Sequence, residues 1–254
     1  MKYLTSVPVI FTLASFLLMP TMAAADGGTV VRATGQVSVE RQGQKLPVRS
    51  GGTSGSPDQQ TFASPGFPLL PGDTLITGNN SNAQVRFDDD SVFSIIGGSA
   101  LQVNQFQMPN AGNGGKAVFS LLRGGFRTIT GSVGKGAGEI YEIRTPAPAA
   151  TIRTLGTTYA AVLCKGDCSA NGKFKEGLYI KAEKGIVIVT SNGGEIHLKA
   201  GQVAFVDAQG GVPVRVKASP FDNPQFAADY AIEIQYDYRV DPPRIEPEPP
   251  ASPS

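Results

Sequence analysis

The stretch from Tyr141 to Val162, YEIRTPAPAATIRTLGTTYAAV, constrains the fold of this chain more than any other. Two strand-like runs meet at a Thr145-Pro146 corner, and the second run ends at Gly156 and Thr157 before the chain continues as a third run. Proline cannot donate to a strand ladder and glycine accepts a left-handed backbone, so both residue types mark bends between strands. The stretch therefore predicts a strand, a corner, a strand and a second corner.

The same succession recurs along the chain. Other corners are expected at Gly72-Asp73, where LPGDTLITG turns, and at Gly124-Gly125 in AVFSLLRGGFRTIT. With 31 Gly, 19 Pro and no Trp, the composition favours many short strands and tight turns. We expect an all-β fold of stacked short strands, twisted and solenoid-like, with a β-sandwich as the alternative.

The N-terminus has the pattern of a secretory signal peptide. Lys2 precedes an apolar run from Val7 to Met19, and a small-residue triplet ends at Ala25. We expect cleavage between Ala25 and Asp26, directly after this triplet. Retention as a membrane anchor is the weaker alternative, because the apolar run is shorter than the roughly 20 residues that a membrane span needs. The mature chain is then expected to be periplasmic or extracellular, without an integral membrane span.

The charge balance argues against nucleic acid as a partner. Loss of Lys2 with the leader leaves 21 basic and 21 acidic side chains. Binding to a nucleic acid needs a clustered basic surface, which a neutral chain without basic runs does not offer.

Composition divides the whole chain into four parts. Residues 1–25 are the signal peptide and residues 26–220 the β domain, with a low-complexity loop at 50–66 that we expect to be mobile. Residues 221–240 are expected to form a short helix followed by a strand. Asn223-Pro224 is typical of a helix start, and Ile232 to Val240 alternates apolar and polar side chains as a strand does. Residues 241–254 are a Pro-rich, disordered tail.

The two cysteines, Cys164 and Cys168, are expected to form a disulfide across a tight hairpin, since an exported chain folds where disulfides persist. A metal site is a poorer interpretation, because His197 is the only histidine and a site needs three or four ligands. A redox pair more often has two intervening residues and a neighbouring helix.

Three further features have both a structural and a chemical interpretation. Asp88 to Asp90 favours a solvated turn over a calcium loop, whose ligands stand at alternate positions. Gly131 to Gly138, GSVGKGAG, lacks the Ser or Thr and the helix of a phosphate-binding loop. His197 lies in an alternating run and is expected on a solvated strand face. No cofactor is expected.

The corners together resemble the signature of FecR domains, the periplasmic modules best known from iron-siderophore signalling. The resemblance covers roughly Val31 to Val206 and rests on Gly72-Asp73, Gly124-Gly125, and the run from Thr145-Pro146 to Gly156-Thr157. The chain departs from the family at Asp89-Asp90-Ser91, where Asp-Gly-Ser is usual. The best-known members carry an anti-sigma segment and a membrane helix before this module, and we expect neither here, so direct transcriptional control is not implied. The resemblance implies a module that receives a protein partner.

These observations lead to one leading hypothesis and two alternatives. The leading one is a non-enzymatic, exported FecR-type protein that binds an envelope protein or a surface polymer as a scaffold or signalling component. The first alternative is a carbohydrate-binding or peptidoglycan-binding module, or an adhesin-like surface module. The second is a glycoside hydrolase, which would need two carboxylates facing one groove, drawn from Asp73, Asp88, Asp90 and Glu139.

Overall fold

The computed structural model describes residues 26–48, 66–110, 113–154, 156–165, 168 and 174–222. The expected signal peptide, nearly all of the 50–66 loop, and the extension and tail from residue 223 onward lie outside these residues. The described part contains 17 strands and one short 3-10 turn, η1 (Pro220–Asp222). The predicted all-β fold is confirmed.

The strands form two sheets that one long strand connects. In sheet A the order is β4 (Phe67–Leu69), β1 (Gly28–Thr34), β6 (Asn82–Phe87), β7 (Val92–Ile95), β9 (Lys116–Ile129), β12 (Thr158–Cys164), β13 (Gly177–Lys184), β16 (Val203–Asp207) and β17 (Val214–Val216). In sheet B the order is β3 (Gln44–Pro47), β2 (Val37–Arg41), β5 (Thr74–Thr77), β8 (Ala100–Gln107), β9, β10 (Ile140–Pro146), β11 (Ala149–Thr154), β14 (Ile186–Ser191) and β15 (Gly194–Lys199).

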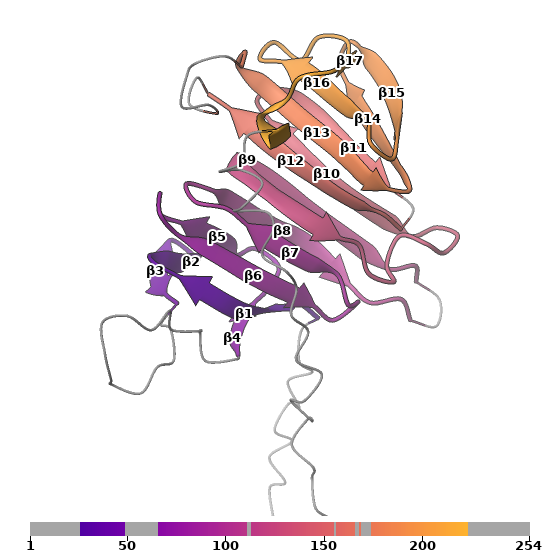
Figure 1. Cartoon of the computed structure of the whole chain (residues 1–254). Coiled ribbons are helices and arrows are strands. Elements are labelled where there is room, and N and C mark those ends of the chain that lie inside the picture. Colours follow the sequence, from indigo (N-terminus) through magenta and orange to yellow (C-terminus); the bar gives the residue numbers. More distant parts are fainter. Residues whose placement is uncertain are drawn as a thin grey trace, which may run out of the picture.

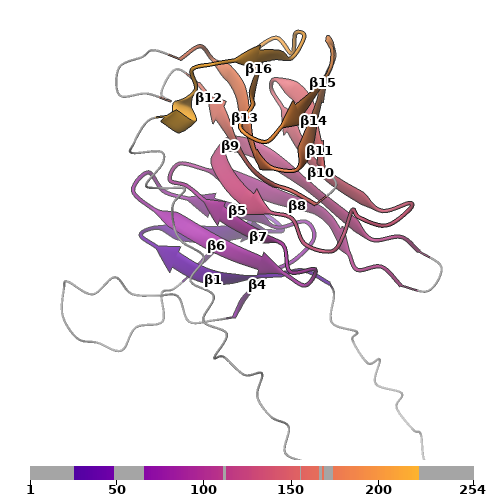
Figure 2. The same ribbon diagram turned by 45° about the vertical axis from the view of Figure 1, so that its right-hand side comes forward.

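The chain passes back and forth between the sheets while it advances along the molecule. The early strands lie at one end and the strands from β13 onward at the other, as the colours of Figures 1 and 2 show. All neighbouring strands pair antiparallel except β9 and β10, which are parallel. This path explains why short strands with a corner every few residues dominate the sequence.

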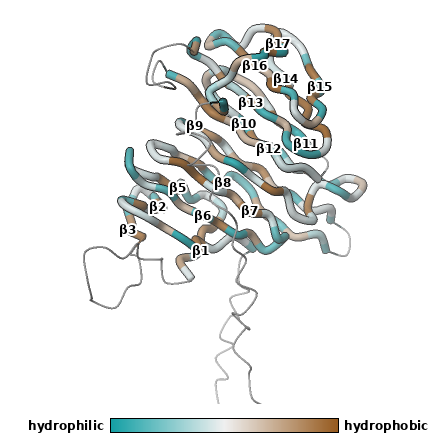
Figure 3. The backbone as a smooth tube through the Cα atoms, viewed as in Figure 1, coloured by the Kyte–Doolittle hydropathy of each residue, from teal (hydrophilic) through white to brown (hydrophobic). Residues whose placement is uncertain are grey.

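Alternation places one side of each sheet in a shared core, and the alternating hydropathy is visible along the strands in Figure 3. Phe119 on the sheet-B part of β9 has its ring 4.9 Å from the rings of both Phe87 and Phe93 in sheet A. Phe126 on the sheet-A part of β9 packs edge-on against Tyr159 at 5.8 Å. Each such side chain contributes about 2 to 3 kcal/mol through burial. The contacts of Phe119 join the two sheets, whereas the contact of Phe126 with Tyr159 joins neighbouring strands of sheet A.

Candidate functional site

The Gly124-Gly125 corner is the point where β9 leaves one sheet and joins the other. Residues up to Arg123 pair with β8, and residues from Gly124 onward pair with β12. Gly124 has φ +70°, and a Cβ atom there would lie 2.2 Å from the Ser99 Oγ. That hydroxyl accepts a hydrogen bond from the Gly125 N–H and donates one to the Gly125 carbonyl. The corner is therefore a crossing between sheets, fixed by a buried serine.

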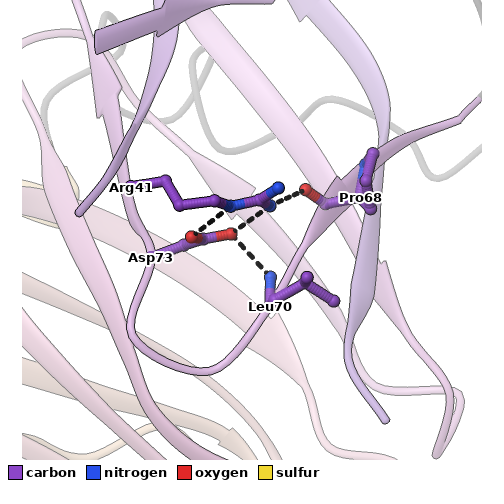
Figure 4. A network of polar contacts seen from close by, with 4 residues as sticks. All are labelled: Arg41, Pro68, Leu70 and Asp73. Carbon is purple, nitrogen blue, oxygen red and sulfur yellow. Dashed lines mark hydrogen bonds and ion pairs between the residues drawn. The ribbon is translucent and has the colours of Figure 1, made fainter. Parts of the chain in front are cut away.

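The Gly72-Asp73 corner holds a nearly buried ion pair (Figure 4). The Asp73 side chain is only 2% exposed, and its carboxylate accepts hydrogen bonds from Arg41 Nε at 2.8 Å and Nη2 at 2.6 Å. It also accepts one from the Leu70 N–H at 2.7 Å. The Arg41 guanidinium donates another bond to the Pro68 carbonyl, so Asp73 ties β2 to the chain before β5.

Three threonines of the Tyr141 to Val162 stretch, Thr145, Thr154 and Thr157, are buried and hydrogen-bonded inside the fold. The Thr145 hydroxyl donates to the Pro148 carbonyl at 2.6 Å and closes the β10–β11 corner. The Thr157 N–H donates to the Thr130 Oγ1 at 2.7 Å, and the Thr130 N–H returns a bond to the Thr157 carbonyl. The Thr154 and Thr157 hydroxyls are hydrogen-bonded to each other. Buried hydroxyls with internal partners stabilise a corner.

Several connections meet beside Gly156, which has φ +74°. A Cβ atom at this position would lie 2.9 Å from Cε of Lys135, so the β9–β10 connection lies against the corner. A Cβ atom on Gly185 would lie 2.6 Å from the Thr157 Cγ2. The end of the molecule formed by residues 88–91, 130–139, 156–157 and 184–186 is called the signature end below.

The β9–β10 connection binds an anion that the chain itself supplies. The Glu139 Oε2 accepts hydrogen bonds from the N–H groups of Gly134 at 2.9 Å, Lys135 at 3.1 Å and Gly136 at 3.0 Å. The hydrogen bond from the Gly136 N–H has the largest effect and lowers the pKa of Glu139 below its ordinary value. Desolvation opposes it, and the N–H groups of Gly134 and Lys135 lower the pKa further. This loop is an anion nest, and its occupant is a structural carboxylate of the same chain.

The acidic turn between β6 and β7 is also structural. Asp89 is buried, and its carboxylate accepts bonds from the Ser91 N–H at 2.9 Å and the Val133 N–H at 3.3 Å. Asp88 accepts a bond from the Gly27 N–H, and Asp90 pairs with Arg86. Asp90 has φ +66°, a left-handed conformation that aspartate tolerates better than most residues. The predicted turn thus forms where the resembled family usually has glycine.

The predicted disulfide between Cys164 and Cys168 is formed, with Cα atoms 5.2 Å apart. It does not close a tight hairpin, because the connection between β12 and β13 extends from residue 165 to residue 176. The bridge ties only the beginning of this connection to the end of β12. Both cysteines are buried in a second apolar cluster, on the side of sheet A that faces away from the core.

The remaining candidates for chemistry are spread over the molecule. His197 is exposed on β15 beside Glu195, with Nε2 and Oε1 2.9 Å apart, as the alternation predicts. Each of the four carboxylates considered for glycoside hydrolysis already has a structural hydrogen-bond or ion-pair partner. These carboxylates are Asp73, Asp88, Asp90 and Glu139. Asp26, at the expected cleavage position, accepts a bond from the Met108 N–H at 2.9 Å. Within the described ranges no group of three metal-ligating side chains comes together.

Two buried tyrosines lie between the sheets and were not singled out in the sequence. The Tyr141 hydroxyl lies 3.4 Å from the Thr128 Oγ1. Burial raises the pKa of Tyr141 and of Tyr159 well above the ordinary value. Both hydroxyls therefore stay protonated at neutral pH and belong to the core.

An exposed apolar row lies at the signature end of sheet B, on the face away from the core. Ile140 is 38% exposed and Ile186 52% exposed, at the start of β10 and β14, with β11 between those strands. Lys116 pairs with Ile140, and Lys199 pairs with Ile186. We call these four residues the lysine-isoleucine row. The sequence pattern did not indicate it, because it is assembled by pairing between distant strands.

Residues 73–177 match the family model described as FecR protein. The chain contains a FecR domain. Before the match, β1 pairs with β6 and β2 with β5. After it, β13 pairs with β12 and β14 with β11, so the flanking strands extend the same two sheets. No curated protein matches the sequence.

Two crystal structures of a candidate anti-sigma factor from Parabacteroides distasonis ATCC 8503 are similar to this FecR-domain chain, each at 14% identity and a TM-score of 0.45. The similarity covers 58% of this chain and 61% of that protein, so the chain spans about three fifths of its length. In the described residues no helix has the length and hydropathy needed to cross a bilayer.

Proposed function

We propose that this protein is an exported, non-enzymatic FecR-domain protein of the cell envelope, which binds another envelope protein as a scaffold or signalling component. The FecR domain at residues 73–177 carries the proposal. The disulfide is compatible with folding in an oxidising compartment. The internal use of the signature threonines and of the Asp73 and Glu139 carboxylates favours binding over catalysis.

The lysine-isoleucine row supports a protein partner of defined chemistry. It presents two half-exposed isoleucines about 10 Å apart, two strand spacings, with a lysine in register beside each. Desolvating the isoleucines provides affinity, and the lysines favour carboxylates at the rim. The proposed partner segment therefore has apolar side chains flanked by aspartate or glutamate.

Photo-crosslinking in the native cells tests this proposal. A photoreactive residue in place of Lys116, and separately of Lys199, is expected to capture the same envelope protein. The matched control is a photoreactive residue at Val212, which is 61% exposed and lies outside the signature end. Equal capture from Val212, or no protein adduct from either lysine position, contradicts a partner at this row.

One observation favours the alternative of a carbohydrate-binding or peptidoglycan-binding module, or of an adhesin-like surface module. Strand β8 carries four amide side chains, and an open pocket is lined by Pro71, Asn104, Gln105, Phe106, Gln107 and Lys116. Amides can both donate to and accept from sugar hydroxyls. Sedimentation with isolated cell wall separates the two functions: retention that is lost in the Asn104→Ala, Gln107→Ala double variant supports the polymer, and no retention supports the protein partner.

A further inference from the structure

The exposed isoleucines of the described residues gather at one end of the molecule. Five large apolar side chains are exposed in this part of the chain: Ile129, Ile140, Ile186, Val212 and Val214. The three isoleucines lie within or directly beside the signature end, whereas the two valines lie just before β17 and in it. Single exposed apolar residues are common on protein surfaces, but a group of them at one place indicates an interaction site.

Ile129 extends this group to the second sheet. Ile140 and Ile186 belong to sheet B, but Ile129 is the last residue of β9 and pairs with strands of sheet A. Its neighbour Thr128 is buried beside Tyr141 between the sheets, so by alternation the Ile129 side chain points away from the core. The isoleucines therefore lie on the two opposite outward sides of the pair of sheets.

The connections of the signature end form a packed bridge between these two sides. The Ser132 N–H donates to the Asp89 carbonyl at 2.8 Å, and the Thr130 N–H donates to the Thr157 carbonyl at 3.0 Å. A Cβ atom on Gly185 would lie 2.6 Å from the Thr157 Cγ2, so the turn between β13 and β14 packs against the same corner. A partner therefore meets a continuous protein surface between the isoleucine of sheet A and those of sheet B.

The charges that this bridge offers to a partner are positive. Lys135 and Lys184 are exposed, and neither ammonium group forms an ion pair with another described residue. The Lys135 side chain lies over the Gly156 corner, which places it between the two sides. The carboxylates of the signature end accept bonds from the chain's own N–H groups or from an arginine. Charge complementarity thus favours acidic side chains on the partner.

We infer that the partner crosses the signature end and contacts both sheets, with one apolar group against Ile129 and another against Ile140 and Ile186. Acidic side chains of the partner between these two groups face Lys135 and Lys184. Packed sheets lie about 10 Å apart, so at least about three extended residues separate the two apolar groups of the partner. The inference rests on the proposed function and adds a contact with sheet A, which the lysine-isoleucine row does not include.

Photo-crosslinking from sheet A in the native cells tests the crossing. A photoreactive residue in place of Ile129 is expected to capture the same envelope protein as one in place of Lys116. Val214 is the matched control and should give no such adduct, because it is 47% exposed on sheet A but lies four strand spacings, about 19 Å, from β9. Capture from Lys116 and Lys199 without capture from Ile129, or equal capture from Val214, overturns the crossing and leaves the proposed function standing. No capture from any of the three positions other than the control overturns both.

Charge reversal on the bridge gives a second readout that leaves the packing of Ile129 unchanged. Lys135→Glu with Lys184→Glu is expected to weaken binding of the captured protein to the full chain several-fold at low salt, and less at high salt. Lys175→Glu with Lys217→Glu makes the same change in net charge at exposed positions outside the signature end and should leave binding unchanged. Equal binding by the two double variants means that the partner does not cross this end.

Discussion

Asp73 and Arg41, 32 positions apart, form a bidentate pair in which the carboxylate is almost fully buried and the guanidinium is 30% exposed. The pair closes the gap between β2 and the chain that enters β5, and the Leu70 N–H completes the carboxylate shell. Because only the carboxylate is buried, the two single substitutions have unequal effects on stability. Removal of Arg41 leaves a buried carboxylate without its counter-charge, whereas removal of Asp73 leaves an arginine that can be solvated.

Arg41→Ala is therefore expected to destabilise the fold by about 3 kcal/mol, because a buried carboxylate loses its counter-charge. Asp73→Ala should cost less in lost charge but leaves the Leu70 N–H without its acceptor. The double variant should be less destabilised than the sum of the two single variants. Urea unfolding of all three proteins measures this coupling, and strict additivity would show that the pair contributes nothing as a pair.

Gly124→Ala tests the crossing between sheets. Its φ of +70° disfavours any Cβ atom, and the new atom would lie 2.6 Å from the Ser99 Cα, which is backbone. We expect a loss of at least about 2 kcal/mol. Gly138→Ala is the matched control, with φ +78° and no atom within 4 Å of the added Cβ, and should cost about 1 kcal/mol. Equal losses would mean that backbone strain alone explains the glycine at 124.

At the Gly124-Gly125 corner the sequence predicts the bend but not the strands that pair on either side of it. A pair of glycines between apolar runs predicts a bend, and the bend is there. That one strand serves both sheets could not be predicted, because it depends on pairing with β8 and β10 before the bend and with β7 and β12 after it. Local patterns determine where a strand bends, whereas its neighbours are chosen by contacts between distant residues.

The loop from Gly131 to Gly138 gives a similar result at the level of the site. The absence of Ser or Thr after Lys135 and of a following helix argued against phosphate, and these are sequence properties. The convergence of three N–H groups on Glu139 was missed, although a glutamate directly after a glycine-rich loop is a signal that can be searched for. The lysine-isoleucine row has no local signal, because its members come from four strands.

The anion nest predicts a pH dependence of stability with a definite sign. The pKa of Glu139 is lowered in the folded state, so its contribution is present above the ordinary value of 4.5 and is lost as the pH falls through the folded-state pKa. Glu139→Gln should lower the melting temperature at pH 7, and the difference from the parent protein should shrink below pH 4.5. Melting curves from pH 7 to pH 3 measure it, with the exposed Glu176→Gln as control. A difference independent of pH would contradict a role for the charge.

The lysine-isoleucine row yields the last prediction, which concerns the proposed partner. Ile140→Asp and Ile186→Asp each remove an apolar contact and place a negative charge among lysines, so each should weaken capture of the partner at least about tenfold, an interface loss of about 1.4 kcal/mol. Lys116→Glu with Lys199→Glu should weaken capture more at low salt than at high salt, because rim charges are screened.

Val212→Asp is the control: it introduces the same negative charge at a residue that is 61% exposed and lies outside the signature end, and it should leave capture unchanged. Affinity measurements with the crosslinked partner decide the matter: if Val212→Asp weakens binding as much as Ile186→Asp, the partner does not recognise the row.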